Sequence, residues 1–325
     1  MVVYIHDSAI MMTRKFRNYF IVSPVNSFRE KQGVGKMIDN KVVAYIHETA
    51  VVSPKAHVAK GVEIGPYAVI GDHVTLAEDV KIGAHAVIDS NVEIGARTRI
   101  EAHAVINSWT SIGKDSRVFQ FASVGAEPQD LKFKGEKSYT IIGDRTTIRE
   151  YSSIHRATGA GEETRVGSDS LLMACTHVAH NCVVGNHVIM SNAAMIAGHA
   201  VVEDRAVLGG MCGIHQFVKI GRNVMIGGMS KVVQDCVPYT IVDGHPARVV
   251  GLNSVGISRA GIPLESRRNI KRAYKILFRS GLSLAQAIAV IEQEVDSSEE
   301  VEHFLRFLRN VDRGICRERR ENEQG

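Results

Sequence analysis

Histidines are unevenly distributed along this chain of 325 residues. Several of the fourteen are scattered through the first half, whereas five of the six between positions 155 and 215 form a cluster. These five are His155, His177, His180, His199 and His215. A neutral imidazole can take a proton from a hydroxyl group near pH 7, which is why histidine is the commonest general base. The cluster therefore predicts a site of proton transfer.

A glycine adds a second element to this chemistry. Gly198 follows His180 by eighteen residues, and in a coil of that length the two would lie one above the other. A position without a side chain leaves room for a substrate to approach both the imidazole and a backbone N–H. A base beside an N–H that can stabilise an oxyanion is the arrangement that acyl transfer needs.

Two polar segments precede and interrupt the histidine cluster, at 127–136 and 157–163. The first contains Gln129, Asp130 and Lys132, which place an amide, a carboxylate and an ammonium group within four residues. Such a set can bind a polar ligand. We therefore expect a substrate-binding loop here.

A repeat of six residues predicts the elements that position these side chains. From Ile46 to Val232 every sixth residue is aliphatic or methionine, except Asp130, Glu136 and Ala160, which all fall in the two polar segments. A period of six fits neither a helix nor an ordinary strand, and it is typical of a hexapeptide parallel β-helix. Three hexads close one triangular coil of about eighteen residues, and the exceptions mark loops that leave the coils.

The repeat also divides the chain. Residues 1–36 lack it and hold six Lys or Arg against two acids. Met37-Ile38-Asp39 directly precedes the first coil, so we interpret 1–36 as an N-terminal extension, either disordered or a mis-assigned start. Residues 37–252 are expected to form the β-helix domain, and residues 253–325 a helical domain.

The helical domain is expected to cover the open end of the solenoid, where unpaired strand edges would otherwise be exposed. Its helices are predicted from Pro263 to Arg279, from Ser283 to about Val295, and from Ser297 or Ser298 to Arg313. The predicted fold class is thus an all-β solenoid with a C-terminal α-helical domain.

Composition excludes several classes of function. The net charge of +4 comes from residues 1–36, because the remainder carries 33 charges of each sign; this argues against binding nucleic acid. No apolar run approaches the roughly 18 residues that a membrane helix needs, so we expect no stable membrane insertion. The five cysteines show no CxxC pair and no metal-ligand spacing. We expect free thiols, no metal site and a cytoplasmic protein.

Short motifs add a family resemblance. They are Met37-Ile38-Asp39, Gln129-Asp130-Leu131-Lys132, Ile154-His155-Arg156, Val166-Gly167-Ser168-Asp169, Leu171-Leu172-Met173, His177-Val178-Ala179-His180, Ala197-Gly198-His199, Gly209-Gly210-Met211, His215-Gln216-Phe217, Gly251-Leu252-Asn253, Ala273-Tyr274-Lys275 and Phe278-Arg279-Ser280-Gly281. In this order they resemble the acyl-[acyl-carrier-protein]–UDP-N-acetylglucosamine O-acyltransferases, which catalyse the first step of lipid A biosynthesis. The resemblance covers residues 37 to about 313.

The resemblance implies a left-handed parallel β-helix of hexapeptide repeats and a homotrimer with sites between neighbouring chains. It implies direct transfer of a 3-hydroxyacyl chain from acyl carrier protein to the glucosamine 3-hydroxyl of UDP-N-acetylglucosamine (UDP-GlcNAc), without a cofactor or metal. His180 would be the general base, and the N–H of Gly198 would hold the thioester oxyanion.

The remaining roles are also implied by the resemblance. Residues that would grip the sugar are Gln129, Asp130 and Lys132. Residues that would line the same cleft are His177, His199, His215 and Gln216. Asn253 and Arg259 would hold the nucleotide, and Gly228 would keep the acyl-chain pocket open. An acidic carrier protein would meet a basic stretch comprising Arg259, Arg267, Arg268, Lys271, Arg272, Lys275 and Arg279, with one acid, Glu265.

Two departures leave questions open. Asn181 follows the base where familiar relatives carry Asp; an amide can orient the histidine but cannot stabilise its positive charge, which keeps a UDP-GlcNAc analogue with a 3-amine open as acceptor. Pro246 replaces a histidine at the end of the acyl pocket, so the chain length stays undecided.

Three alternatives remain at this stage. The N-acyltransferase of the same pathway shares the solenoid, but it carries an N-terminal uridine-binding domain and lacks the Gln-Asp-Leu-Lys loop. A γ-carbonic-anhydrase-like zinc solenoid needs three converging imidazoles and an HxxxxH pair, whereas His177 and His180 stand three apart. A purely structural solenoid would give the polar loop no purpose.

Overall fold

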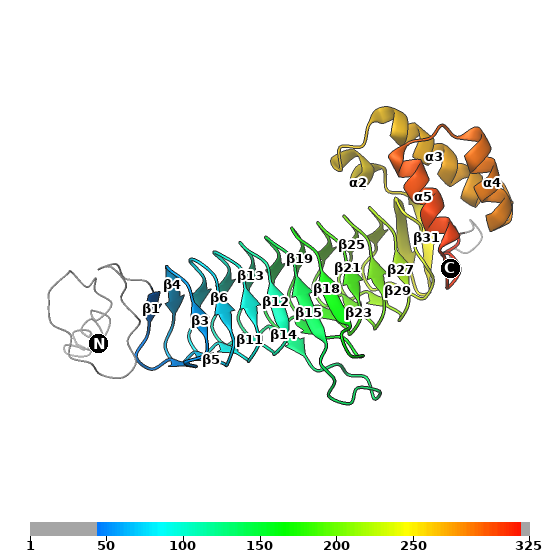
Figure 1. The fold of residues 1–325 in the computed structure, drawn as a ribbon. Helices are drawn as coiled ribbons and strands as arrows, with labels where there is room; N and C mark the ends of the chain where they lie inside the picture. Colours follow the sequence, from blue (N-terminus) through cyan, green and yellow to red (C-terminus); the bar gives the residue numbers. More distant parts are fainter. Residues whose placement is uncertain (1–43, 320–325) are drawn as a thin grey trace, which may run out of the picture. The chain divides into compact units, whose positions relative to one another are not determined.

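The computed structural model describes residues 44–319, in which three parallel sheets wind around one continuous core (Figure 1). The extension 1–36 lies outside the described residues, as do 37–43 and 320–325. Each coil contributes one strand to each sheet. The predicted fold class, a left-handed parallel β-helix of hexapeptide repeats with C-terminal helices, is confirmed.

The strands are mostly two or three residues long. The first sheet contains β1 (Ala44–Ile46), β4 (Val62–Ile64), β7 (Lys81–Ile82), β10 (Arg99–Ile100), β13 (Arg117–Val118), β16 (Thr147–Ile148), β19 (Leu171–Leu172), β22 (Ile189–Met190), β25 (Val207–Leu208), β28 (Met225–Ile226), β30 (Thr240–Gly244) and β31 (Ala247–Leu252). The second contains β2 (Val51–Val52), β5 (Val69–Ile70), β8 (Val87–Ile88), β11 (Val105–Ile106), β14 (Ser123–Ala126), β17 (Ser153–His155), β20 (His177–Val178), β23 (Met195–Ile196), β26 (Gly213–Ile214) and β29 (Lys231–Val232). The third contains β3 (His57–Val58), β6 (Thr75–Leu76), β9 (Glu93–Ile94), β12 (Thr110–Ile112), β15 (Tyr139–Ile142), β18 (Glu163–Val166), β21 (Val183–Val184), β24 (Val201–Val202) and β27 (Lys219–Ile220).

The hexad residue of each coil points inward. Ile64 pairs with Ile82, and Ile82 with Ile100, one coil apart in register, and all three are buried. Stacking these side chains removes a continuous apolar column from water, which is the main stabilising contribution in a solenoid. The glycine after the hexad residue follows from the close spacing of the coils: a Cβ on Gly83 would lie 2.5 Å from the backbone N of Ala102.

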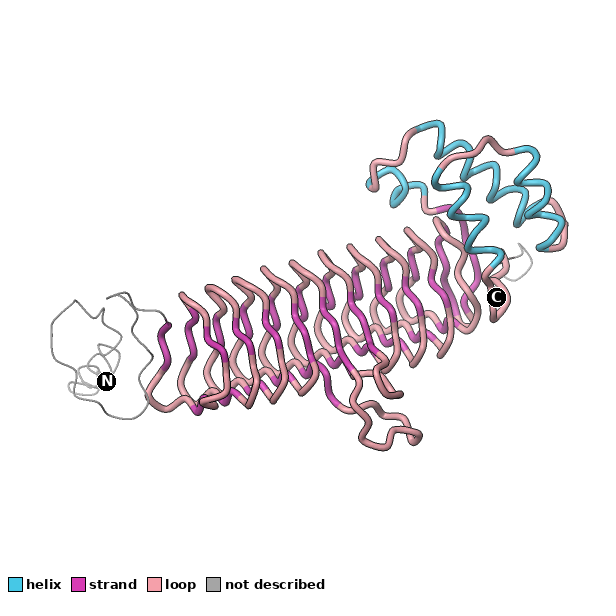
Figure 2. Tube along the Cα trace, viewed as in Figure 1, coloured by secondary structure: helices cyan, strands magenta, loops and turns pink. Residues whose placement is uncertain are grey.

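The two polar segments are insertions that preserve the register. Thr110 of β12 lies opposite Thr140 of β15, thirty residues on, and Thr140 lies opposite Thr164 of β18, twenty-four residues on. Compared with a coil of eighteen, the insertions therefore add two hexads and one hexad. The first projects from the solenoid as a long loop between β14 and β15 (Figures 1 and 2).

The solenoid ends in an antiparallel hairpin of β30 and β31, followed by α2 (Ser254–Arg259), α3 (Leu264–Arg279), α4 (Leu284–Glu294) and α5 (Glu299–Arg309). Ser283 and Ser298 cap α4 and α5, because their hydroxyls accept backbone N–H groups of the first turn. The last helix ends at Arg309, four residues before the expected Arg313. Among residues 44–319, no helix is long and apolar enough to cross a membrane.

The chain after α5 returns to the solenoid instead of continuing the helix. Ile315 pairs with Asp235, and Glu318 with Val249. The Asp235 carboxylate is buried, and it accepts the N–H groups of Lys219 (2.8 Å) and Asp312 (3.1 Å). A buried carboxylate satisfied by backbone donors joins this return segment, residues 312–319, to the last coil.

Candidate active site

A cavity of about 310 Å³ lies on the outer face of the second sheet, across β17, β20, β23 and β26. Its lining consists of Gln129, His155, His177, Ala179, His180, Met195, Ile196, Ala197, Gly198, Gly213 and Ile214. Each of these four strands contributes an outward-facing residue to the cavity. The cavity thus brings together three of the clustered histidines, a residue of the first insertion and Gly198.

His180 lies directly against Gly198. A Cβ at position 198 would lie 2.6 Å from Nε2 of His180 and 2.7 Å from Cε1, so only glycine leaves the ring in place. Within residues 44–319, the N–H of Gly198 has no hydrogen-bond acceptor. A ring nitrogen and a free backbone N–H therefore meet at one point of the cavity wall.

Asn181 determines how the imidazole is held. Its Oδ1 accepts the Nδ1–H of His180 (2.8 Å) and the backbone N–H of Thr158 (2.9 Å), while its Nδ2 donates to the Thr158 carbonyl oxygen (3.0 Å). Asn181 itself adopts a φ of +57°, a left-handed conformation that Asn tolerates better than most residues. With Nδ1 protonated, Nε2 carries the lone pair.

Two further histidines form the floor of the cavity. The rings of His155 and His177 meet edge to face with centroids 4.9 Å apart, and His177 Nδ1 lies 2.8 Å from the Ser153 hydroxyl. Burial, followed by the neighbouring His177 and His180, lowers the pKa of His155 to about 4. Burial also lowers the pKa of His177, with a smaller contribution from His180. Both rings are therefore neutral near pH 7. His155 belongs to the predicted histidine cluster and to a family motif, although no individual role was predicted for it.

His199 lies beside His180 at the rim of the cavity. Its ring meets His180 edge to face (5.2 Å) and stacks on Phe217 (4.8 Å). Partial burial lowers the pKa of His199, and the proximity of His180 adds to this effect. A neutral His199 can accept or donate a hydrogen bond next to the base without competing with it for positive charge.

The first insertion brings polar groups to the same place. Gln129 lines the cavity, and Asp130 is held by the N–H of Lys132, which donates to its Oδ1 (3.0 Å). This hydrogen bond is the main cause of a lowered pKa for Asp130, and the nearby His180 also lowers it. The Lys132 side chain is exposed. The loop therefore presents a carboxylate, an amide and an exposed ammonium group close to His180.

Arg156, which belongs to the motif Ile154-His155-Arg156 but had no predicted role, is buried and contacts the first insertion. Arg156 directly follows His155, and its guanidinium lies 5.2 Å from the ring centroid of Phe133 and donates to Glu127 (3.1 Å). Both partners belong to the first insertion. Arg156 therefore anchors the loop to the strand that carries a cavity histidine.

Similarity to known proteins covers most of the chain. The family model described as "Udp N-acetylglucosamine O-acyltransferase; Domain 2" matches residues 235–316, and the model "Bacterial transferase hexapeptide (six repeats)" matches residues 73–108. The acyl-[acyl-carrier-protein]–UDP-N-acetylglucosamine O-acyltransferase of Thermodesulfovibrio yellowstonii is 45% identical over 84% of this chain and 99% of its own. The chain belongs to this O-acyltransferase family.

Solved structures of the family have the same fold. LpxA from Acinetobacter baumannii is 40% identical, with a TM-score of 0.73, and the match covers 84% of this chain and 99% of that one. The UDP-N-acetylglucosamine acyltransferase of Arabidopsis is 35% identical, with a TM-score of 0.80, over 84% of this chain and all of that one.

Other residues suggested by the family resemblance lie outside the cavity. His215 and Gln216 are exposed one coil further on, and Gly228 is exposed in the coil after that. Asn253 caps α2 by accepting the N–H of Gly256 and donates to the Asn223 carbonyl (2.8 Å). Arg259 is exposed in the last turn of α2. A single chain of this O-acyltransferase therefore assembles part of the predicted site.

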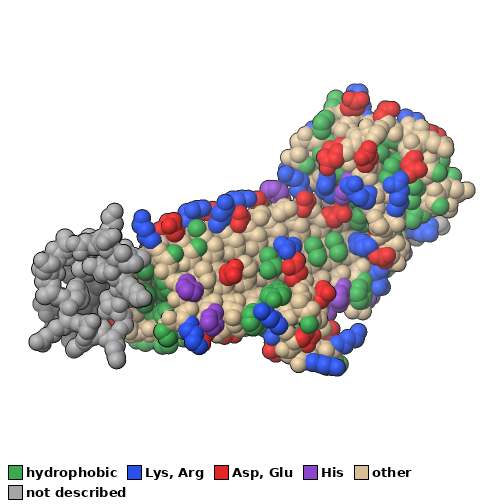
Figure 3. All heavy atoms as spheres, in the orientation of Figure 1, with side chains coloured by type: hydrophobic (Ala, Val, Ile, Leu, Met, Phe, Trp, Pro, Cys, Tyr) green, Lys and Arg blue, Asp and Glu red, His purple; other side chains and the backbone are tan. Residues whose placement is uncertain are grey.

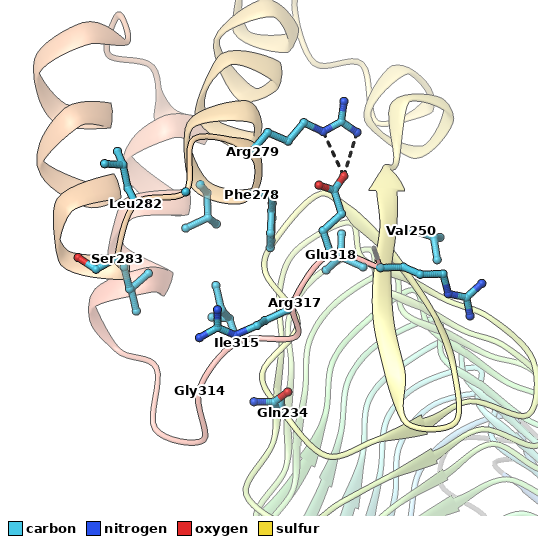
Figure 4. Close-up of a pocket in the computed structure, with 15 residues that line it drawn as sticks. Gln234, Val250, Phe278, Arg279, Leu282, Ser283, Gly314, Ile315, Arg317 and Glu318 are labelled. Atoms are coloured by element: carbon cyan, nitrogen blue, oxygen red, sulfur yellow. Dashed lines mark hydrogen bonds and ion pairs between the residues drawn. The ribbon is translucent and has the colours of Figure 1, made fainter. Parts of the chain in front are cut away.

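A second, larger cavity, of about 1240 Å³, lies elsewhere, between the α3–α4 connection and the return segment (Figure 4). Arg279 and Glu318 form an ion pair at its edge (2.8 Å), and Phe278 projects into it. None of the residues that line it is a histidine. This cavity therefore lacks the imidazoles that mark the candidate site of proton transfer, although it is larger.

Proposed function

We propose that this protein transfers a 3-hydroxyacyl chain from acyl carrier protein to the glucosamine 3-hydroxyl of UDP-GlcNAc, the first step of lipid A biosynthesis. Its relatives are named for this reaction. The observation that carries the proposal is the contact between His180 Nε2 and the backbone of Gly198, with Nδ1 held by Asn181. A base and an unpaired N–H on one wall of a cavity suit an attack on a thioester.

The chemistry follows from this geometry. Nε2 of His180 takes the proton of the 3-hydroxyl as its oxygen attacks the thioester carbon. The negative charge that develops on the carbonyl oxygen is stabilised by the N–H of Gly198, a contribution that is typically about 3–4 kcal/mol for such a donor. The C–S bond then breaks, and the proton on His180 passes to the leaving thiolate of the carrier protein.

Asn181 does not require an amine acceptor. Its amide is matched to Thr158, because Oδ1 meets an N–H and Nδ2 meets a carbonyl of the same residue. This local pairing gives a reason for Asn at 181 that is independent of the acceptor. It removes the reason to infer a 3-amine acceptor from Asn181, and the ordinary 3-hydroxyl substrate remains the proposal.

The loop and rim residues are proposed to bind the sugar nucleotide. Gln129, Asp130 and Lys132 would grip the sugar beside the base, and His177 and His199 would line its cleft. Residues further along the solenoid and in α2 are assigned to the cleft, the nucleotide and the acyl chain. They are His215, Gln216, Asn253, Arg259 and Gly228.

A homotrimer would bring these separated residues to one site. The cavity is formed by one wall of a single chain, and large apolar side chains are exposed in it and elsewhere along the solenoid: Met195 in the cavity is 52% exposed, and Met211 and Met229 at a neighbouring corner are 65% and 72% exposed. Exposed methionines in such number suit a protein interface. Sedimentation should show a species of about 107 kDa, three times the chain mass of 35.6 kDa. A stable, active monomer would contradict this assembly.

Helix α3 offers a docking surface for the acidic carrier protein. Cations at three- and four-residue spacing lie on one exposed face: Arg268, Lys271, Arg272, Lys275 and Arg279. Within residues 44–319, Arg272 and Arg279 pair with acids while the other three have no ion-pair partner. Both charge types appear on the helical domain in Figure 3. With an acyl carrier protein as donor, the enzyme would act in the cytoplasm.

An acyl-transfer assay tests the proposal, with a radiolabelled 3-hydroxyacyl chain carried by acyl carrier protein. UDP-GlcNAc and its 3-amino analogue should be offered separately to the same enzyme preparation. We expect transfer to UDP-GlcNAc with the higher kcat/KM. Strong preference for the amine would revise the acceptor, and transfer to neither would overturn the proposed reaction.

A further inference from the structure

The two insertions are joined through the carboxylate of Glu136. One oxygen accepts the N–H of Gly159 in the second insertion (2.8 Å), and the other accepts the N–H of Lys134 in its own loop (2.7 Å). The hydrogen bond from Gly159 is the main cause of a lowered pKa for Glu136, so the carboxylate is ionised near pH 7. An ionised acceptor forms stronger hydrogen bonds than a neutral one. Glu136 therefore holds the start of the second insertion against the first.

The second insertion in turn contacts the partner of the base. Thr158, next to Gly159, pairs through both its N–H and its carbonyl with the Asn181 amide. A backbone N–H can only donate and a carbonyl can only accept. The amide consequently has one allowed orientation, with Oδ1 toward His180.

This orientation decides which nitrogen of His180 carries the proton. Oδ1 can only accept, so Nδ1 must be protonated, and in the neutral ring the lone pair is on Nε2, which faces Gly198. If the amide were reversed, its NH₂ group would donate to Nδ1 and the proton would move to Nε2, which could then take none from a substrate. The tautomer of the base thus depends on where Thr158 is held.

We propose that Glu136 is a positioning residue for catalysis: by holding Gly159, it places Thr158 so that Asn181 keeps His180 in the active tautomer. This inference rests on the proposed role of His180 as base. The insertion that contains Glu136 also carries Gln129, Asp130 and Lys132. The state of this loop and the state of the base are therefore linked by one chain of hydrogen bonds.

The test compares Glu136→Ala with Glu136→Gln. The alanine variant loses both acceptors, and we expect kcat to fall roughly tenfold or more, with less than a threefold change in KM for UDP-GlcNAc, because displaced catalytic groups slow the chemical step. The glutamine variant keeps one carbonyl oxygen for Gly159, and we expect it to retain most of the activity. Glu163→Ala is the matched control, since Glu163 is a carboxylate at the end of the second insertion that pairs only with Arg165 among residues 44–319 (2.7 Å).

The direct readout is the tautomer of His180, measured by ¹⁵N solid-state NMR on histidine-labelled enzyme and assigned by its loss in His180→Gln. The wild type and the glutamine variant should show a protonated Nδ1 and an unprotonated Nε2. The alanine variant should show a mixture of the two tautomers. A single wild-type tautomer in Glu136→Ala, or a loss confined to KM, would overturn the proposal.

The tautomer measurement does not require turnover, which separates the two hypotheses. If the wild type transferred no acyl group to UDP-GlcNAc, the proposed function would fail while the tautomer comparison would still decide the role of Glu136. If Glu136→Ala did not fold, Glu136→Gln would decide. An altered His180 tautomer in Glu136→Gln would contradict the proposal, and an unaltered tautomer with preserved kcat would support it.

Discussion

His180 and Gly198 occupy equivalent positions in successive coils, and the imidazole lies where the side chain of residue 198 would be. Gly198→Ala should therefore displace the base and lower kcat at least a hundredfold, because a Cβ would lie 2.6 Å from Nε2. The melting temperature should change little. Gly251→Ala is the control, since a Cβ there meets nothing within 4 Å. Normal turnover in Gly198→Ala would exclude the assigned contact.

Removing the base tests the proposed mechanism directly. His180→Ala should lower kcat by roughly 10²–10⁴-fold, the usual contribution of a general base. Folding should be preserved, because the core residues Val178 and Val184 are untouched; circular dichroism and sedimentation check this. If turnover stayed near the wild-type level, the role of base would pass to another group, with His177 as the first candidate.

The hydrogen bonds between Asn181 and Thr158 predict two effects of Asn181→Asp, one on stability and one on the pH profile of activity. A carboxylate oxygen of Asp would replace the NH₂ group that donates to the Thr158 carbonyl, so two acceptors would face each other. The free energy of unfolding should therefore fall by about 1–3 kcal/mol. The added negative charge favours a protonated imidazole, so the acidic limb of the kcat/KM profile should move to higher pH. Asn91→Asp is the control, because Asn91 has a similar corner conformation (φ +60°). Unchanged stability and an unchanged profile would show that the amide has no special partner.

Burial of His155 predicts a pH dependence of stability. Its pKa is lowered from 6.5 to about 4 by burial and by two neighbouring histidines. As the pH falls through 6.5 the unfolded chain takes up a proton, whereas the folded chain does so only near pH 4. The stabilisation is therefore complete above about pH 6.5 and is lost progressively toward pH 4. Urea unfolding at pH 7 and pH 4.5 should show a smaller loss for His155→Gln than for the wild type. Equal losses would contradict the assignment.

The sequence predicted the parts of this structure that depend on periodicity. The hexad frame predicts the coils, and the spacing of eighteen residues correctly predicts that Gly198 stacks on His180. The insertions were recognised from the residues that break the frame, such as Asp130 and Glu136, because a charged side chain cannot replace an aliphatic one in the core.

Contacts between loops and distant segments could not be predicted in this way. The pairing of Asn181 with Thr158 and the position of Arg156 depend on the path of irregular backbone, for which the repeat carries no information. The antiparallel hairpin of β30 and β31 and the return of the chain to Asp235 begin where the hexads end. Their partners are far apart in sequence, so no local pattern reports them.

The return segment has a consequence for how the protein loses its structure. In a stack of coils each layer contacts only the next, so unfolding can begin at an exposed end and proceed layer by layer. Residues 312–319 contact the final coil, which lies about eighty positions earlier in the chain. The contacts are those of Asp235 and the adjacent Cys236–Cys316 pair (Sγ–Sγ 3.8 Å). That coil cannot separate until the contact with the return segment breaks, so we expect the first openings at the other end of the described coils, away from the histidines of the candidate site.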